Sequence, residues 1–431
     1  MSEVDAKFQR PIIVVTGATS GVGYGICERL LSQLCSSTPP DINALQLDST
    51  DTRTYAPLHN GLQFPCEALT LILACIPLSD GEKTKERLLK SLDTKIEKMK
   101  RRKGYDGHAE RFREHLHIEP IYCNLLDIES IFRCAALIKQ RFHYVSHLVL
   151  NAGINAVIGK DMLKFLKDYI QSPISAVTSP KYLIESYGEI SPDGLGYVWQ
   201  LNVFGHFVLY RALSQHMEIA PFPMVRVLWM SSLDAIAKEY DSRDWQLIKT
   251  VKPYEASKYE VDLLSATLDR IPRLGDEKQD TGSNVARIRH FTVHPGVVAT
   301  QIGFRIEKSW IDRLFKLILF YLARYLGSPY HTINPFYAAI VATYLILVLQ
   351  IILDIVVLRH YLGMEVRSSS AVPNPSPIKY SARKPRIGRE HVTPERIDEW
   401  DSHEEEGRLL LDRFEGLYDE FHIKEGIFED K

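Results

Sequence analysis

The sequence has almost no net charge and no paired-cysteine motif. Its 52 Lys and Arg nearly balance 54 Asp and Glu, so its 431 residues carry a formal net charge of −2. A chain this close to neutral has no global field to attract a polyanion, and no nucleic-acid partner is expected. The six cysteines form no Cys-x-x-Cys pair and no zinc-ligand spacing. This predicts free, buried thiols in a reducing compartment and no metal site.

Long apolar segments are also scarce, and no signal peptide is expected, since the N-terminus is polar. Residues 335–358 are predominantly apolar and long enough to span a bilayer. Gln350 and Asp354 interrupt this segment, and a carboxylate inside a membrane is costly. Ala338 and Ala342 suit close packing of a helix against a sheet. We therefore expect a core helix whose C-terminal half reaches into or along a membrane, in preference to a full span.

A glycine-rich segment follows the first apolar run. Residues 11–15 predict a buried parallel strand, residues 16–23 are Thr-Gly-Ala-Thr-Ser-Gly-Val-Gly, and residues 24–34 have a helical composition. Strand, glycine turn and helix are the context in which backbone N–H groups at a helix N-terminus bind a pyrophosphate. A plain tight turn is the alternative, and the flanking strand and helix favour dinucleotide binding.

Tyr254 and Lys258 are four residues apart, so on a helix both side chains lie on one face, one turn apart. An ammonium group beside a phenol favours the phenolate and lowers the tyrosine pKa from its usual value of about 10. Such a pair provides a general acid–base group near neutral pH. An exposed helical pair without chemistry is the alternative, because this spacing is common by chance.

Three motifs in this order resemble the short-chain dehydrogenase/reductase family: Gly17-x-x-x-Gly21-x-Gly23, Asn151-Ala-Gly153 and Tyr254-x-x-x-Lys258. The resemblance covers residues 11–300 and implies an α/β fold, a doubly wound parallel sheet of the Rossmann type. By the family's pattern the catalytic residues are Asn202, Ser232, Tyr254 and Lys258, with Ser231 as the alternative to Ser232. The same pattern places the cofactor on Gly17, Ser20, Gly21, Val22, Gly23, Asn124, Asn151, Tyr254, Lys258, Pro295, Gly296, Val298 and Thr300.

The resemblance also implies roles for these residues. Ser232 and Tyr254 would hydrogen-bond a substrate carbonyl oxygen and stabilise the developing alkoxide, and Tyr254 would donate its proton. Lys258 would bias Tyr254 and hold the nicotinamide ribose, while Asn202 would hold a water that passes protons to Lys258. Asn124 stands where the family usually has an aspartate for the adenine.

NADPH is expected in preference to NADH. In related NAD enzymes an acidic residue at the end of the second strand accepts a hydrogen bond from the ribose 2′-OH. Here Cys75 is followed by Ile76 and Pro77, and the cations Lys83, Lys85 and Arg87 lie nearby. The arginine that many NADP members carry directly after this strand is absent.

The remaining segments are assigned by composition. We expect a catalytic domain over 1–300, insertions at 36–65 and 238–249, a loop with a short helix over 154–197, a lid and apolar membrane-associating helices over 301–365, and a flexible linker with a charged terminal helix over 366–431. The second insertion either borders the substrate mouth or decorates the surface.

Residues 305–326 predict an amphipathic lid helix. At 100° per residue its cations fall on one side: Arg305, Lys308, Arg313, Lys316 and Arg324. Its apolar side chains fall on the other: Trp310, Ile311, Leu314, Leu317, Ile318, Tyr321 and Tyr325. This pattern is typical of a helix in a membrane interface, and equally of a lid packed on its own protein.

Several features together are similar to the fungal 3-keto-steroid reductases. They are the two insertions, the Asn-Val-Phe-Gly-His sequence at 202–206 and the apolar segment after Thr300. This resemblance implies NADPH-dependent reduction of a sterol 3-ketone to the 3β-hydroxyl, after C-4 decarboxylation in ergosterol-type synthesis. It also implies the endoplasmic reticulum membrane and lipid droplets, a catalytic domain facing the cytosol, and partner enzymes of the C-4 demethylation assembly.

The residues themselves support only a bulky, apolar ketone dissolved in a membrane. Two other functions stay open. One is a membrane-bound reductase for retinal or a 17-ketosteroid. The other is a membrane scaffold that kept the fold and lost catalysis, against which the intact Ser232, Tyr254 and Lys258 count.

Overall fold

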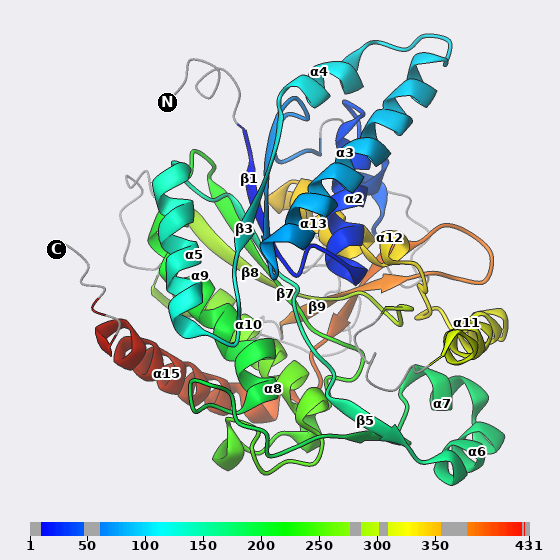
Figure 1. The fold of residues 1–431 in the computed structure, drawn as a ribbon, viewed down its shortest axis with the longest axis vertical. Coiled ribbons are helices and arrows are strands. Elements are labelled where there is room, and N and C mark those ends of the chain that lie inside the picture. The colour runs from blue at the N-terminus through cyan, green and yellow to red at the C-terminus, as the bar shows by residue number, and fades with distance from the viewer. Residues whose placement is uncertain are drawn as a thin grey trace, which may run out of the picture.

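A doubly wound, mainly parallel sheet organises the chain (Figure 1). The computed structural model describes residues 10–46, 61–275, 286–300, 309–354, 377–424 and 426, with backbone alone for 271–275. The strands lie in the order β10-β9-β8-β7-β4-β1-β2-β3, and each pairing is parallel apart from β9 with β10. Their bounds are β1 Ile12–Thr16, β2 Leu69–Cys75, β3 Leu116–Tyr122, β4 His147–Leu150, β7 Met224–Met230, β8 Arg287–His294, β9 Ile378–Arg383 and β10 His391–Arg396.

Helices cover both faces of this sheet (Figure 1). On one face lie α2 Gly21–Leu34, α3 Leu78–Lys100, α12 Pro335–Ala338 and α13 Ile340–Leu347. On the other lie α5 Ile128–Arg141, α9 Gly205–Glu218, α10 Pro253–Gly275 and α15 Trp400–Lys424. The smaller elements are α4 His108–Glu114, β5 Val157–Lys160, α6 Met162–Gln171, α7 Pro173–Thr178, β6 Leu183–Glu185, α8 Tyr197–Trp199 and α11 Trp310–Tyr325.

The central strands have the apolar runs that a sheet covered on both faces requires. Every residue of β1 and β2 is buried, and Val14 pairs with Ile72 in register. The chain begins its sheet at β1, proceeds to the β3 edge, and then continues from the other side of β1 through β4. This reversal creates the crevice at the carboxyl ends of β1 and β4 where doubly wound sheets bind ligands. The predicted fold class is confirmed.

The predicted flexible linker is wrong for its described part. Residues 378–383 form β9, which extends the parallel sheet beside β8 and then turns back into β10. Its polar composition misleads because the polar side chains have buried partners: Lys379 Nζ lies 2.7 Å from Asp262, and Ser381 donates to Glu395 at 2.6 Å. Tyr380, between them, is buried against the sheet. The predicted terminal helix is present as α15.

The apolar segment 335–358 enters the core, as expected. All eight residues of α13 are buried, and Ala338 and Ala339 are fully enclosed beside α2. Within the residues that the structure describes, every helix falls short of the length and apolar character required to cross a bilayer. The structure describes 347–354 of the C-terminal half of this segment and not the residues after 354, so its contact with a membrane stays a prediction.

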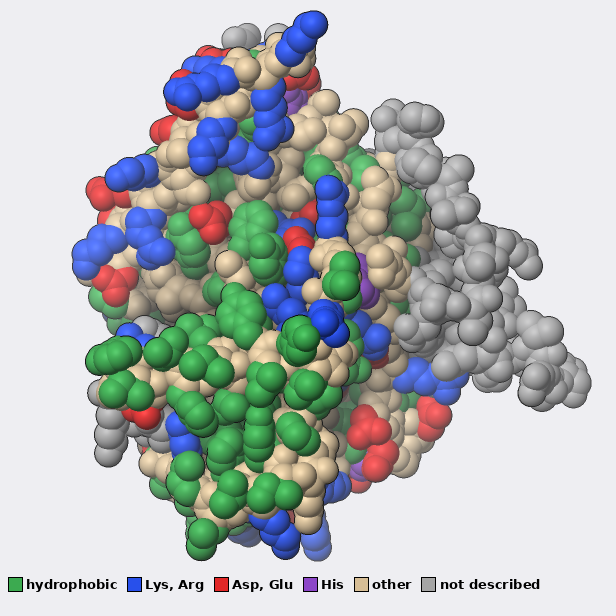
Figure 2. All heavy atoms as spheres, turned by 90° about the vertical axis from the view of Figure 1, so that its right-hand side faces the viewer, with side chains coloured by type: hydrophobic (Ala, Val, Ile, Leu, Met, Phe, Trp, Pro, Cys, Tyr) green, Lys and Arg blue, Asp and Glu red, His purple; other side chains and the backbone are tan. Residues whose placement is uncertain are grey.

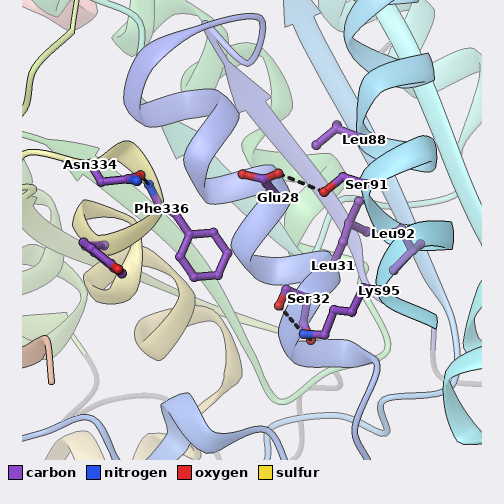
Figure 3. A pocket seen from close by; sticks show the side chains of 10 residues that line it. Glu28, Leu31, Ser32, Leu88, Ser91, Leu92, Lys95, Asn334 and Phe336 are labelled. Carbon is purple, nitrogen blue, oxygen red and sulfur yellow. Dashed lines mark hydrogen bonds between the residues drawn. The ribbon is translucent and has the colours of Figure 1, made fainter. Parts of the chain in front are cut away.

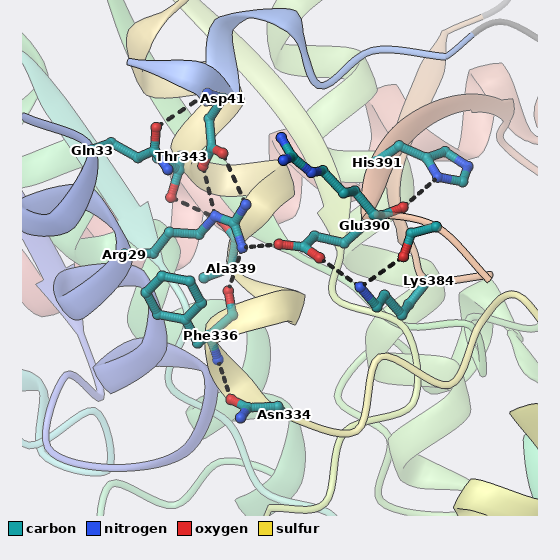
Figure 4. Close-up of polar contacts among 12 residues, drawn as sticks. Arg29, Gln33, Asp41, Asn334, Phe336, Ala339, Thr343, Lys384, Glu390 and His391 are labelled. Carbon is teal, nitrogen blue, oxygen red and sulfur yellow. Dashed lines mark hydrogen bonds and ion pairs between the residues drawn. The ribbon is translucent and has the colours of Figure 1, made fainter. Parts of the chain in front are cut away.

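A buried ion-pair network ties the C-terminal hairpin to α2 (Figure 4). Arg29 donates to both carboxylate oxygens of Asp41, at 2.6 and 2.8 Å. Its third nitrogen donates to Glu390 at 2.9 Å and to the carbonyl of Phe336 at 2.8 Å. Lys384 binds the other oxygen of Glu390 at 2.9 Å. The network therefore joins α2, the turn after it, α12 and the β9–β10 hairpin.

Candidate active site

The glycine loop occupies the turn between β1 and α2. Gly17 and Gly21 have φ values of +64° and +53°, a region that favours glycine. A Cβ on Gly23 would lie 2.3 Å from the carbonyl oxygen of Gly17, so only glycine fits there. Ser20 is the exposed N-cap of α2, and its side chain makes no capping bond. The first backbone donors of α2, including Val22, are therefore oriented for an anion.

Thr16 connects the glycine loop to the Asn-Ala-Gly turn after β4. Its hydroxyl accepts from the backbone N–H groups of Asn151, at 2.8 Å, and Ala152, at 3.0 Å. The Asn151 side chain returns a bond to the carbonyl of Thr16 at 3.0 Å. Thr16 also contacts the buried imidazole of His206 at 3.1 Å. Through its own hydrogen bonds, Asn151 therefore joins the two turns that are predicted to bind the cofactor.

The predicted catalytic pair lies at the start of α10. Tyr254 is in the first turn, and Lys258 follows one turn later with its ammonium 5.9 Å from the tyrosine ring centroid. Ser232, which follows β7, lies beside Tyr254 and lowers the pKa of its phenol. Ser231 is buried and donates to the carbonyl of Lys258 at 3.4 Å. The geometry therefore favours Ser232 over Ser231 as the serine that faces a substrate with Tyr254.

The expected effect of Lys258 on Tyr254 is not what this structure shows. Burial raises the pKa of Tyr254, the Asp234 carboxylate raises it further, and the hydrogen bond from Ser232 lowers it in part. Burial also lowers the pKa of Lys258 to about 8. The Lys258 ammonium donates to the carbonyl of Met230 at 2.9 Å. The expectation failed because it weighed the nearby charge and left out the desolvation of both groups.

Asn202 lies in a π-helical turn, Gln200–Phe204, that precedes α9. Its side-chain oxygen accepts from the N–H of Ile154 at 2.8 Å, and its side-chain nitrogen donates to the Ile154 carbonyl and to Ser257, both at 3.0 Å. A Cβ on Gly153 would lie 3.2 Å from Asn202 Oδ1 and 3.5 Å from Lys258 Nζ. Asn202 and Lys258 thus both border Gly153, while the Asn202 side chain holds the turn after it.

The second predicted cofactor segment follows β8. Thr332 donates to the carbonyl of Pro295 at 2.9 Å, and Val298 forms a bridge with Ile333. Gly296 has a φ of +72° and packs against a backbone carbonyl. A Cβ on Gly21 would lie 3.2 Å from the Thr300 side chain.

The two predicted cofactor segments, distant in sequence, therefore meet at Gly21 and Thr300. Backbone donors lie on one side and a loop braced by residues 330–333 on the other. This cradle fits a dinucleotide. The roles assigned to the individual residues remain predictions.

The residues predicted to lie near the adenosine end of the cofactor make contacts with other parts of the protein or are exposed. Asn124 follows β3, and its side-chain oxygen accepts from the N–H of Leu126 at 3.1 Å. Ile76 is half exposed at the end of β2. Lys83 pairs with Asp80 on the surface at 3.0 Å. Arg87 lies farther along α3, with its guanidinium 4.4 Å from the ring centroid of Tyr24.

Two carboxyl groups beside the predicted catalytic pair were missed by sequence reasoning. Glu185, at the end of β6, accepts from the N–H of Tyr254 at 2.9 Å, and burial raises its pKa to about 8. Asp234 accepts from Ser179 at 2.8 Å, and burial raises its pKa to about 6. No spacing signals these partners, because they come from segments far from α10 in the sequence.

The predicted lid helix, α11, packs against the protein by its charged side and not by its apolar side. Lys316 donates to the carbonyl of Thr300 at 3.1 Å, and Arg324 donates to the carbonyls of His331 and Thr332 at 2.6–2.8 Å. These cations face the protein, and the apolar side faces outward. Lys316 thereby attaches α11 to the end of the cofactor turn. Arg305 and Lys308 fall outside the described residues.

The second insertion packs through Trp245 against α8 and α15. Trp245 packs edge-on against Trp199 and contacts Phe414 of α15.

A cavity of about 390 Å³ lies between α2, α3 and α12 (Figure 3). Its walls include Glu28, hydrogen-bonded to Ser91 at 2.9 Å, but neither Ser232 nor Tyr254.

Comparisons with known proteins point to one group of enzymes. No protein-family model matches the chain. The 3-keto-steroid reductase of Kluyveromyces lactis is 34% identical over 211 residues, which are 49% of this chain and 56% of that one. The 3-keto-steroid reductase of Schizosaccharomyces pombe is 29% identical over 333 residues, or 77% of this chain and 80% of that one. The chain thus spans little more than half of the first enzyme and much more of the second.

Solved structures resemble the chain less closely. A short chain dehydrogenase/reductase family protein is 15% identical, with a TM-score of 0.39, over 78% of this chain and 89% of that one. The L-sorbose reductase of Gluconobacter frateurii is 13% identical, with a TM-score of 0.44, over 78% of this chain and 90% of that one. The fold assignment rests on the strand order and not on these superpositions.

Proposed function

We propose that the chain is a short-chain dehydrogenase/reductase that reduces a sterol 3-ketone to the 3β-hydroxyl with NADPH, because it is similar to the fungal 3-keto-steroid reductases. The curated relatives confirm the resemblance that the motifs predict. The observation that carries the proposal is the placement of Ser232 beside Tyr254, with Lys258 one turn away, next to a cradle for a dinucleotide. The proposed step belongs to ergosterol-type synthesis, after C-4 decarboxylation.

The chain's own residues handle the oxygen of the ketone. The hydroxyls of Ser232 and Tyr254 donate to the carbonyl oxygen and stabilise the charge that develops on it. The raised pKa of Tyr254 keeps its proton on the phenol until the alkoxide forms, so the tyrosine acts as the acid. Lys258, with a pKa of about 8, is available to resupply that proton. A bound nicotinamide cofactor supplies the hydride to the carbonyl carbon.

NADPH is the proposed form of that cofactor. Ile76 and Pro77 follow β2 where an acidic side chain would otherwise accept from a ribose 2′-OH. The half-exposed Ile76 presents no negative charge to a 2′-phosphate. Ser20 adds an exposed hydroxyl at the N-cap of α2.

The endoplasmic reticulum membrane and lipid droplets are the proposed locations, with the catalytic domain facing the cytosol. The substrate class supports this, because a sterol ketone dissolves in lipid and not in water. Other enzymes of sterol C-4 demethylation are the proposed protein partners.

The test is turnover of purified protein on 3-ketosteroids, retinal and 17-ketosteroids, followed through NADPH oxidation. The parent should reduce 3-ketosteroids, and Tyr254→Phe should abolish turnover while cofactor still binds, because only the acidic hydroxyl is removed. Tyr259→Phe is the matched control, since this buried tyrosine on the same helix bonds Asp398 and His403 instead. Near-normal turnover by Tyr254→Phe would reject the assigned acid, and preference for retinal or a 17-ketosteroid would reject the substrate.

A further inference from the structure

Two helices on one side of the molecule present their apolar side chains to solvent (Figure 2). On α6 the exposed apolar residues are Met162, Leu163, Leu166 and Ile170. On α11 they are Trp310, Ile311, Leu314, Phe315, Ile318, Tyr321, Leu322 and Tyr325. Helix α7 packs against both and lies between them (Figure 1). The result is a continuous apolar surface, far larger than the scattered single residues that soluble surfaces ordinarily expose.

Helix α6 is built as an amphipathic surface helix. Leu163, Leu166 and Ile170 recur three and four positions apart, which places them on one side. Leu163 is 84% exposed and Ile170 is 73% exposed, so this side has no protein covering in the described chain. Lys164 and Lys167 are exposed on the same helix. Asp161 is occupied as the N-cap, where it accepts from the N–H of Lys164.

Helix α11 adds an aromatic edge to this surface. Trp310 is 72% exposed, and Tyr321 and Tyr325 are more than half exposed on the same side. Aromatic side chains with one polar end are enriched where lipid meets water. The β9–β10 turn continues the surface, because Arg386 stacks on Tyr325 at 4.0 Å and the next residue, Ile387, is 85% exposed.

The elements behind this surface end at the catalytic residues. The segment that includes α6 and α7 leads into β6, where Glu185 holds the N–H of Tyr254. Ser179, directly after α7, binds Asp234, two residues from Ser232. Lys316 of α11 binds Thr300 of the cofactor turn. The apolar surface is therefore the outer side of the segments that enclose the site.

We propose that α6 and α11 together form a docking surface for a lipid bilayer, and that an apolar ketone enters the site from lipid between these elements. The entry of the ketone from lipid rests on the proposed function. A bilayer fits better than a second protein because the apolar stripe is bordered by Lys164, Lys167 and Arg386, which match anionic headgroups. Interfacial helices bury their apolar side at the boundary between the headgroups and the acyl chains, and they keep their cations at the headgroups.

The test is flotation of the full chain with neutral and anionic vesicles of phosphatidylcholine, without and with phosphatidylserine. Leu163→Ser/Leu166→Ser and Leu314→Ser/Ile318→Ser should each lower the vesicle-bound fraction by about tenfold or more, because each pair removes exposed apolar area. Lys164→Glu/Lys167→Glu should weaken binding to anionic vesicles by roughly tenfold or more and leave neutral vesicles unchanged. Leu409→Ser/Ile423→Ser, on the exposed side of α15, is the matched control and should bind like the parent.

The outcomes separate this proposal from the proposed function. If the α6 and α11 variants stay folded and bind vesicles like the parent, the docking surface is refuted. If they convert a dimeric parent to a monomer without changing vesicle binding, the surface joins two copies of the chain, and the proposal is again refuted. With docking correct, the variants should lose turnover of vesicle-dissolved ketone and keep turnover of a detergent-solubilised one. If the parent floats but reduces no ketone, the proposed function fails and the docking surface stands.

Discussion

Replacing Arg29 by methionine should destabilise the protein strongly, although Arg29 is far from the catalytic pair in sequence. Arg29 is 3% exposed, and its guanidinium bonds Asp41 twice, Glu390 and the Phe336 carbonyl. Glu390 would keep Lys384, whereas the Asp41 carboxylate would remain buried without its guanidinium. Removing one partner of such a buried pair costs about 3–5 kcal/mol. That is a large part of the roughly 5–15 kcal/mol by which native domains are stable.

The assay is thermal unfolding followed by circular dichroism, with two comparison variants. Arg243→Met breaks a similar two-point contact with Asp241, at 3.0 Å for each bond, on the solvent-exposed surface. It should leave the melting temperature unchanged, because water replaces the lost partner. Arg29→Met/Asp41→Leu should recover much of the loss, since no unpaired charge stays buried. If Arg29→Met melts like Arg243→Met, the network contributes nothing and the reasoning is wrong.

Two further predictions concern the site. The parent should bind NADPH more tightly than NADH in fluorescence titrations. Ile76→Asp should shift the preference to NADH, because it places a carboxylate at the end of β2. Tighter NADH binding by the parent would contradict this prediction. Glu185→Leu should lower kcat by about tenfold to a hundredfold, because the first turn of α10 loses the acceptor that positions Tyr254. Glu185→Gln keeps that acceptor and should retain most activity; equal losses in the two variants would rule out the hydrogen bond as the cause.

Much of the fold and of the cofactor loop could be predicted because the signals are local. A strand, a glycine turn and a helix in direct succession specify how the backbone folds at Gly17, Gly21 and Gly23. The order of the apolar runs then determines the sheet, since right-handed crossovers leave few ways to arrange parallel strands. Tyr254 and Lys258 needed only a helix to share one face, and α10 provides it.

Long-range partners could not be predicted, because composition does not identify them. The segment around Tyr380 has the composition of a linker, yet it forms a strand in which Lys379 pairs with Asp262 and Ser381 donates to Glu395. The direction of the pKa shift at Tyr254 likewise depends on burial and on Asp234, which spacing along a helix does not reveal.

The sequence shows the amphipathic pattern of α11. Three backbone carbonyls that bind Lys316 and Arg324 determine which side of the helix faces the protein. The sequence by itself therefore determined the fold class and the order of the chemical groups. The tertiary structure decided their burial, their partners and the side of the molecule that faces outward. Those properties depend on residues that meet only after the chain has folded.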